Sequence, residues 1–302
     1  MGLEIPFYLT LCVTASIVVT MNRLTTNHRA RVIAALVEGN SVRATVRMTG
    51  IAKNTIQKLV LDLGAACAAY ADAHLRGLPC RRIECDEVWA FCYAKAKNVP
   101  DDKRGRFGFG DVWTWVAMDA DTKLICSWLV GTRDAGCAYE FMRDLASRLR
   151  HRVQLTTDGH RPYLMAVEDA FGSDIDYATL IKLYGQPVEE ARRYSPARII
   201  SAQAAVIAGN PDPKHSSTSY IERQNLTVRM SMRRFTRLTN GFSKKIDNHT
   251  AAVALHYLHY NFCRVHQSLR VTPAMEAGVS DHVWSVAELV GLLSDSKTLT
   301  AA

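Results

Sequence analysis

The chain has 302 residues, enough for one large hydrophobic core with a smaller unit beside it. It carries 37 Lys and Arg against 29 Asp and Glu, and this formal net charge of +8 favours a polyanionic partner such as nucleic acid. No two of the eight cysteines have the spacing of a zinc knuckle or a Cys-x-x-Cys redox site, so we expect reduced thiols in a cytoplasmic protein.

The first 20 residues form an apolar extension whose only charge is Glu4. Residues 5–21 are uncharged and reach the length of about 17 residues at which a membrane span begins to be feasible. The acidic start and the Thr and Ser content are not typical of a secretory signal. We therefore expect no membrane insertion, and we interpret Met21 as the natural start.

Residues 21–79 are predicted to form three helices. Apolar residues recur there at helical spacing in three short blocks, which Gly39-Asn40-Ser41 and Thr49-Gly50 separate. The pattern fits a plain three-helix bundle or a helix-turn-helix, and the basic chain favours the DNA-binding form. Its last helix would present four polar side chains to a DNA groove: Lys53, Asn54, Gln57 and Lys58.

From residue 80 the apolar period changes to two, which indicates strands. Strands are predicted over 81–91 and over 111–131, the second range folding into a hairpin around residues 119–123. A helix over 135–150, a strand ending at Asp158, a short helix over 164–171 and a strand over 174–185 follow. This succession predicts a mixed α/β fold, a central mixed sheet flanked by helices.

Residues 185–218 are rich in Gly and Pro, so we predict a long loop or insertion. A helix is expected to begin near Ser219 and to continue past Phe235, and another to span 246–262. The predicted division is an extension (1–20), a helix-turn-helix domain (21–79), a catalytic domain (80–275) with its insertion (185–218) and a C-terminal tail (276–302).

Three acids lie at positions that are unusual for acids. Asp86 lies inside an apolar strand, Asp158 ends a strand, and Glu222 opens a helix and is followed by seven basic residues before the next acid. Each alone could be a surface ion pair or a helix cap. Together they fit a site for two Mg²⁺ or Mn²⁺ ions, which catalyses phosphoryl transfer on nucleic acid. Glu87 is also an acid, but strand alternation predicts that only one of Asp86 and Glu87 is a ligand.

The predicted helix from Ser219 places Glu222, Arg229 and Arg233 on one face, at about 100° per residue. This face lies apart from an apolar stripe that begins at Ile221. It could hold metal with its first residue and DNA phosphates with its later turns, although a solvated surface helix is the alternative. The candidate DNA contacts of this segment are Arg223, Asn225, Arg229, Arg233 and Arg234.

A rival metal site is conceivable near the C-terminus. His256, His259, Cys263 and His266 follow one another at three, four and three residues, which could place them on one helix face around zinc. Aromatic packing of "HYLHYNF" explains the same residues, and we favour that interpretation.

Several segments resemble the transposases of the insertion-sequence-one type, bacterial enzymes with a ribonuclease H-like DDE catalytic domain. They are "CDEVWAF", "GDVWTWVAMD", "LTTDGH", "STSYIERQNLTVRMSMRRFTRLTNGFSKK" and "HYNFCRVHQSLRVTPA", and the "YIERQN" and "TTDGH" blocks are the most specific. The resemblance covers roughly residues 22–290. It implies that Asp86, Asp158 and Glu222 are the catalytic acids, and that the N-terminal helix-turn-helix binds the terminal inverted repeats of a mobile element.

The sequence therefore predicts a DNA transposase that cuts element ends and joins their 3′-hydroxyls to target DNA with two Mg²⁺ or Mn²⁺ ions. Its partner would be double-stranded DNA, and a homodimer or larger assembly is expected because two ends are held together. We expect it in the cytoplasm, associated with the nucleoid. The alternatives are a non-catalytic repressor derived from a transposase and a structure-specific nuclease.

Overall fold

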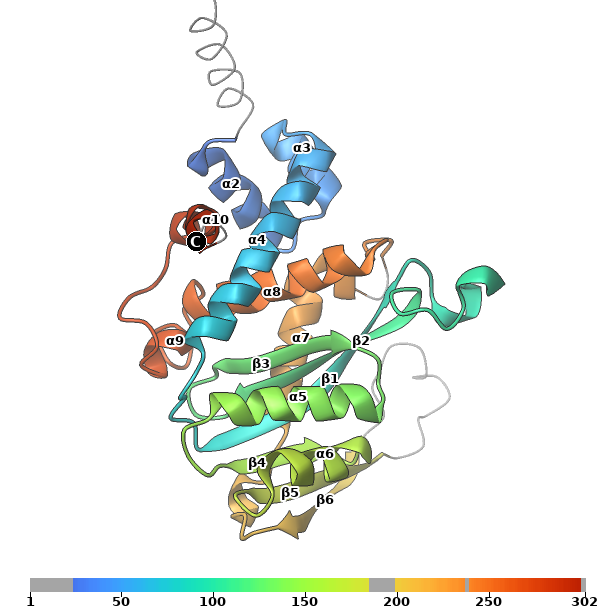
Figure 1. Ribbon diagram of the computed structural model, residues 1–302, viewed down its shortest axis with the longest axis vertical. Helices are drawn as coiled ribbons and strands as arrows, with labels where there is room; N and C mark the ends of the chain where they lie inside the picture. Colours follow the sequence, from blue (N-terminus) through green and yellow to red (C-terminus); the bar gives the residue numbers. More distant parts are fainter. Residues whose placement is uncertain (1–23, 185–198, 237–238, 300–302) are drawn as a thin grey trace, which may run out of the picture.

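The computed structural model describes residues 24–184, 199–236 and 239–299 (Figure 1). The predicted extension, residues 1–20, and the first part of the predicted insertion lie outside these ranges. The helices are α2 (Thr26–Val37), α3 (Val42–Thr49), α4 (Lys53–His74), α5 (Ala135–Arg148), α6 (Pro162–Phe171), α7 (Ser219–Ser231), α8 (Ile246–Phe262), α9 (Pro273–Glu276) and α10 (Val286–Leu299). The strands are β1 (Arg82–Cys92), β2 (Gly110–Asp119), β3 (Ile125–Gly131), β4 (Gln154–Asp158), β5 (Asp176–Tyr184) and β6 (Ile199–Ala208).

Three helices, α2, α3 and α4, occupy the N-terminal positions that the apolar periodicity predicts. The Thr25 hydroxyl caps α2 by accepting the N–H of His28, and Ser41 caps α3 by accepting the N–H of Ala44. Gly50 ends α3 in the left-handed conformation, at φ 71°, which glycine adopts without strain. The breaker residues therefore set the helix boundaries here.

The six strands form one mixed sheet in the order β3-β2-β1-β4-β5-β6. Strand β1 runs antiparallel to β2 and parallel to β4, and β4 runs parallel to β5. The central strands β1, β4 and β5 therefore run in the same direction, and their carboxyl ends lie along the same edge of the sheet. The predicted mixed α/β architecture, a mixed sheet flanked by helices, is confirmed.

Strand β6 corrects the prediction of an irregular loop over 185–218. Residues 199–208 pair antiparallel with β5, for example Leu180 with Ala204, and so extend the sheet by an edge strand. The Gly and Pro residues that suggested a loop lie outside this decapeptide, "IISAQAAVIA", which contains neither. The composition of the whole segment concealed a short strand within it.

Helix α7 ends earlier than predicted. It stops at Ser231, Met232 adopts an extended conformation, and a short 3-10 turn covers Arg233–Phe235. The bend buries Met232 and Phe235 in a cluster with Ile221. Tertiary packing thus overrides helix continuity, and Arg233 does not lie on the helical face of Glu222.

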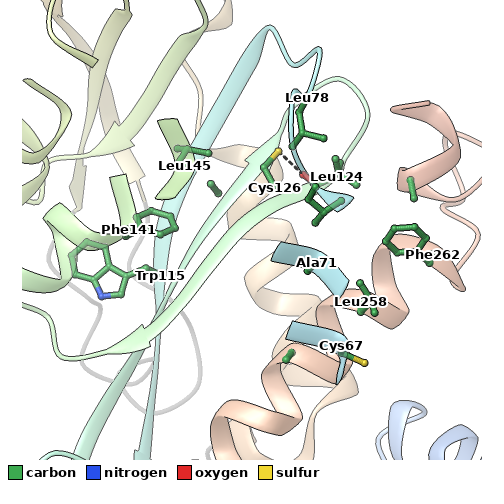
Figure 2. Close-up of a cluster of buried hydrophobic side chains, with 14 of the residues drawn as sticks. Cys67, Ala71, Leu78, Trp115, Leu124, Cys126, Phe141, Leu145, Leu258 and Phe262 are labelled. Atoms are coloured by element: carbon green, nitrogen blue, oxygen red, sulfur yellow. Dashed lines mark hydrogen bonds between the residues drawn. The ribbon is translucent and has the colours of Figure 1, made fainter. Parts of the chain in front are cut away.

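Helices cover both faces of the sheet. Helices α5 and α6 cover one face, whereas α7 and α8 pack on the other (Figure 1). Helix α4 runs along α8 so closely that a Cβ at Gly64 would lie 2.5 Å from the Cα of Ala251. Figure 2 shows Cys67 and Ala71 of α4 beside Leu258 of α8. One continuous core therefore joins the N-terminal helices to the sheet region.

The predicted C-terminal tail contains α10, which packs against α2 and α4. Its Leu289 and Val290 are buried in the main core. Within the described ranges, no helix is long and apolar enough to cross a membrane.

Candidate active site

Asp86 of β1 and Asp158 of β4 meet at one edge of the sheet. The parallel pairing of the two strands runs as far as Cys85 opposite Thr157, so the next residue on each strand is an aspartate. Ligand oxygens of Asp86, Glu87 and Asp158 all lie within 4.8 Å of one another, a spacing that could hold a divalent ion. The sequence prediction that Asp86 and Asp158 lie together agrees with this geometry.

Strand alternation predicts that Asp86 and Glu87 point to opposite faces, but the carboxylates of both lie in the acid cluster. The Asp86 carboxylate turns along the strand and accepts the N–H of Glu87 at 2.8 Å. Both carboxylates therefore reach the same small volume.

Asp86 is half-buried, and one of its oxygens accepts a 2.7 Å hydrogen bond from the side-chain amide of Asn225 on α7. Burial is the largest cause that raises the pKa of Asp86 to about 6, and the negative charges of Asp158 and Glu222 contribute to this rise. Glu222 thus lies close enough to Asp86 to act on its ionisation.

Glu87 is the most enclosed acid of the group, with a side chain that is 0% exposed. Burial raises its pKa to about 7, although the hydroxyl of Tyr163 and the guanidinium of Arg133 favour the charged form. Arg133 donates from Nε at 3.0 Å and stacks over the ring of Trp113. It also lies 3.6 Å from Asp158, so one arginine balances two acids.

Glu222 lies at the margin of the acid cluster. It accepts a 2.6 Å hydrogen bond from the Thr218 hydroxyl and forms an ion pair with Lys182 of β5. Its side chain is 44% exposed. The tight group in the described part of the chain is Asp86, Glu87 and Asp158, without Glu222. The structure brings two of the three predicted acids together and leaves the third paired with a lysine.

Glu84 contributes to this site, although the sequence analysis assigned it no role. Its buried carboxylate accepts the backbone N–H groups of Tyr220 and Ile221, both at 2.9 Å, and so caps the first turn of α7 from the sheet. Burial raises the pKa of Glu84 to about 7. The available signal was its position two residues before Asp86, on the same strand face.

The predicted DNA contacts of α4 lie at its N-terminal end. Lys53 and Asn54 are exposed and Gln57 is half-buried. Lys58 is exposed and pairs with Asp62 at 2.7 Å. All four side chains are accessible to a partner.

The predicted contacts around α7 differ in their surroundings. Arg223 and Arg233 are exposed, whereas Arg229 is half-buried. Asn225 is buried against Asp86, and Arg234 donates to the Ser243 hydroxyl at 2.7 Å. Asn225 and Arg234 therefore hold parts of the protein together, while Arg223 and Arg233 face solvent.

The histidine-rich segment gives no metal cluster among the residues that the structure describes. His256 is buried against Tyr257, and burial lowers its pKa to about 3. Helix α8 ends at Phe262, so Cys263 and His266 lie beyond the helix that would have aligned them with His259. Core packing, the interpretation favoured from the sequence, accounts for His256.

No protein-family model and no curated protein matches the sequence. Among solved structures, a piggyBac transposase synaptic complex with hairpin DNA is similar over 93% of this chain and 74% of that chain, with 11% identity and a TM-score of 0.37. A Mos1 transposase paired-end complex with its left transposon end gives 13% identity, coverage of 59% and 68%, and a TM-score of 0.24. A Mos1 strand transfer complex gives 11% identity, 85% coverage of both chains and a TM-score of 0.24. Scores this low decide neither fold nor function, which rest on the residues described above.

Proposed function

We propose that this protein is a DNA transposase of the DDE type, which cleaves the ends of a mobile element and joins them to target DNA. The observation that carries the proposal is the meeting of Asp86 and Asp158 at one sheet edge, with Glu222 close enough to raise the pKa of Asp86. The sequence blocks around these acids, which resemble insertion-sequence-one transposases, support the same reaction.

The acid cluster fits divalent metal. Three carboxylates within 4.8 Å of one another repel when they are ionised. Burial and this repulsion together raise the pKa values of Asp86 and Glu87. Carboxylate oxygens are hard ligands, which Mg²⁺ and Mn²⁺ prefer. Two such ions, when bound, activate the attacking oxygen and stabilise the leaving oxygen of a phosphodiester.

Asp86 and Asp158 are the proposed central ligands, and Glu222 completes the set from the solvent side. Arg133 already pairs with the enclosed Glu87, whereas Glu222 is 44% exposed and would exchange Lys182, its lysine partner, for the metal. Glu87 then holds Arg133 beside the cluster. This division assigns metal binding to three acids and positioning to the fourth.

Other residues supply DNA contacts in this proposal. Arg223, Arg229 and Arg233 would bind phosphates near the cut, while Lys53, Asn54, Gln57 and Lys58 would read the element ends as part of a helix-turn-helix. Because both ends must be held together, the active form would be a homodimer or a larger assembly.

The test uses the purified protein, Mg²⁺ and labelled DNA that carries the inverted repeats flanking the gene. Wild type is expected to cut at the repeat ends and to form joined products. Asp158→Asn should abolish both products, whereas Asp169→Asn, on the exposed part of α6, should leave them unchanged. Binding without cleavage by wild type would contradict the proposal in favour of a repressor, and cleavage indifferent to end sequence would favour a nuclease.

A further inference from the structure

Residues 93–109, which connect β1 to β2, form an arm that projects from the body of the molecule (Figure 1). Two short 3-10 turns, Ala96–Asn98 and Asp101–Lys103, lie within it. Strand β1 carries Asp86 and continues for six residues to Cys92 before the arm begins. The arm therefore extends from the same edge of the sheet as the acid cluster.

The arm is basic and largely exposed. Asp101 pairs with Arg104 at 2.9 Å, while Lys97 and Arg106 are exposed and make no ion pair with any residue that the structure describes. The basic residues outnumber the two acids of the arm, Asp101 and Asp102. They are Lys95, Lys97, Lys103, Arg104 and Arg106.

Phe107 stands out among these charges. Its side chain is 51% exposed and lies next to Arg106 near the start of β2. Gly105 and Gly108 on either side have φ values of 78° and 86°, so tight backbone turns place the ring at the surface. An exposed aromatic ring among unpaired cations is the combination that stacks on nucleic-acid bases while cations hold the backbone.

The arm is anchored at its base. The N–H of Tyr93 donates to the carbonyl of Ser243 at 2.8 Å, and Val99 is buried. At the other end, Gly108 fits against Ile246, since a Cβ there would lie 3.0 Å from the Ile246 Cβ. An anchored arm loses little conformational entropy on binding, which favours contact with a rigid partner.

The basic aromatic surface continues onto the segment that holds the arm. The ring of Phe242 packs on Phe91 at 4.7 Å, and the Lys244 ammonium lies 4.3 Å from the Phe242 ring. Lys244 and Lys245 are both exposed. Charged residues are depleted from the cores of protein interfaces, so this surface fits DNA better than a second copy of the chain.

We propose that the β1–β2 arm is a second DNA-binding element, in which Phe107 inserts against a base and Lys97 and Arg106 hold the adjacent phosphates. At about 3.3 Å per strand residue, the six residues after Asp86 carry the arm about 20 Å from the acid cluster. At about 3.4 Å per base pair, the contact falls about six base pairs or more from the reactive phosphodiester. The inference rests on the proposed action on DNA.

The test uses full-length protein and end-containing duplexes with 2-aminopurine at successive positions on either side of the cut. Wild type should change the fluorescence at one position six or more base pairs from the cut. Phe107→Ala should remove that change and weaken binding about tenfold, and Phe107→Trp should restore both. Val283→Ala, at an apolar side chain outside the arm that is 42% exposed, is the control and should behave as wild type.

The charge contribution has its own readout. Lys97→Gln with Arg106→Gln should lower the slope of log affinity against log salt by about two. If wild type binds and joins ends while Phe107→Ala matches it in binding and fluorescence, the arm proposal is overturned and the proposed function stands. A changed oligomeric mass without a changed DNA contact would also overturn it, and a wild type that neither binds nor cuts DNA would overturn both.

Discussion

The side-chain amide of Asn225 donates a 2.7 Å hydrogen bond to Asp86 Oδ2, and this contact joins helix α7 to strand β1 inside the acid cluster. Asn225 was expected to contact DNA, yet its side chain is buried and positions the Asp86 carboxylate. Partners of this kind fix the orientation of a metal ligand.

Replacing Asn225 should therefore reduce activity more than DNA affinity. We expect Asn225→Ala to lower the rate of end cleavage about 10- to 100-fold, because Asp86 loses the contact that orients it. The control is Thr227→Ala, whose hydroxyl donates to the carbonyl of Arg223 on the same helix. Cleavage kinetics with Mg²⁺ and DNA binding measured in parallel check this, and a loss of affinity with normal cleavage would show that Asn225 contacts DNA.

The Glu84 cap of α7 predicts a difference between two substitutions. Glu84→Ala should lower the free energy of unfolding by about 1–3 kcal/mol, because the buried N–H groups of Tyr220 and Ile221 lose their acceptor. Glu84→Gln keeps an acceptor oxygen and should lose less. Urea denaturation measures both variants, and equal losses would show that the charge of Glu84 matters rather than its hydrogen bonds.

Lys182 provides a test of Glu222 as the proposed third metal ligand. Lys182→Met removes the cation that competes for Glu222, so the affinity for Mn²⁺ should rise several-fold if Glu222 is a ligand. The rise should disappear when Glu222→Gln is added. Arg143→Met, at an exposed arginine paired with Asp169, is the matched control. Isothermal titration with Mn²⁺ gives the affinities, and an unchanged value in Lys182→Met would point to Glu87 as the third ligand instead.

We expect two buried histidines to lower the free energy of unfolding as the solution becomes acidic. His249 is 0% exposed and His256 is 5% exposed, and burial lowers the pKa of each to about 3. Below the unfolded pKa of about 6.5, these histidines bind protons in the unfolded chain but stay neutral in the native state. Each histidine should therefore remove about 1.4 kcal/mol per pH unit as the pH falls from about 6 to 4.

Urea unfolding between pH 8 and pH 4 measures this slope. His256→Phe should flatten it by about 1.4 kcal/mol per pH unit, because one proton-binding site is lost from the unfolded chain. His28→Phe, at an exposed histidine, serves as the control for the substitution itself. A slope unaffected by His256→Phe would mean that this histidine is already protonated in the native state.

The strands and helices that follow their own periodicity were predictable from the sequence. The hairpin around residues 119–123 and helix α8 lie where the pattern indicates, and Asp86 and Asp158 meet because they lie at neighbouring positions of the parallel strands β1 and β4. The site was harder to predict where contacts between distant parts of the chain determine the position of a side chain. Glu87 joins the cluster, although strand alternation predicts that it points away from Asp86.

Burial also decided the elements that the sequence misassigned. Helix α7 bends at Met232 because this residue and Phe235 enter a core whose other members lie on β1, β2, β3, α7 and α8. The Lys182 partner of Glu222 comes from β5, forty residues away. Neither relationship leaves a local signal, whereas the basic β1–β2 arm did carry one in its run of Lys, Arg and Phe.

Helix α10 has a consequence for the order in which the chain acquires its structure during synthesis. Its Leu289 and Val290 are buried in the core that contains α2 and α4, yet the ribosome makes it after both helices and the sheet strands. Part of the apolar surface of the helices at residues 26–74 therefore stays exposed to solvent until the whole sheet region and α10 have been translated. A chain that stops before residue 286 would leave that surface open permanently, which makes truncated products targets for proteolysis.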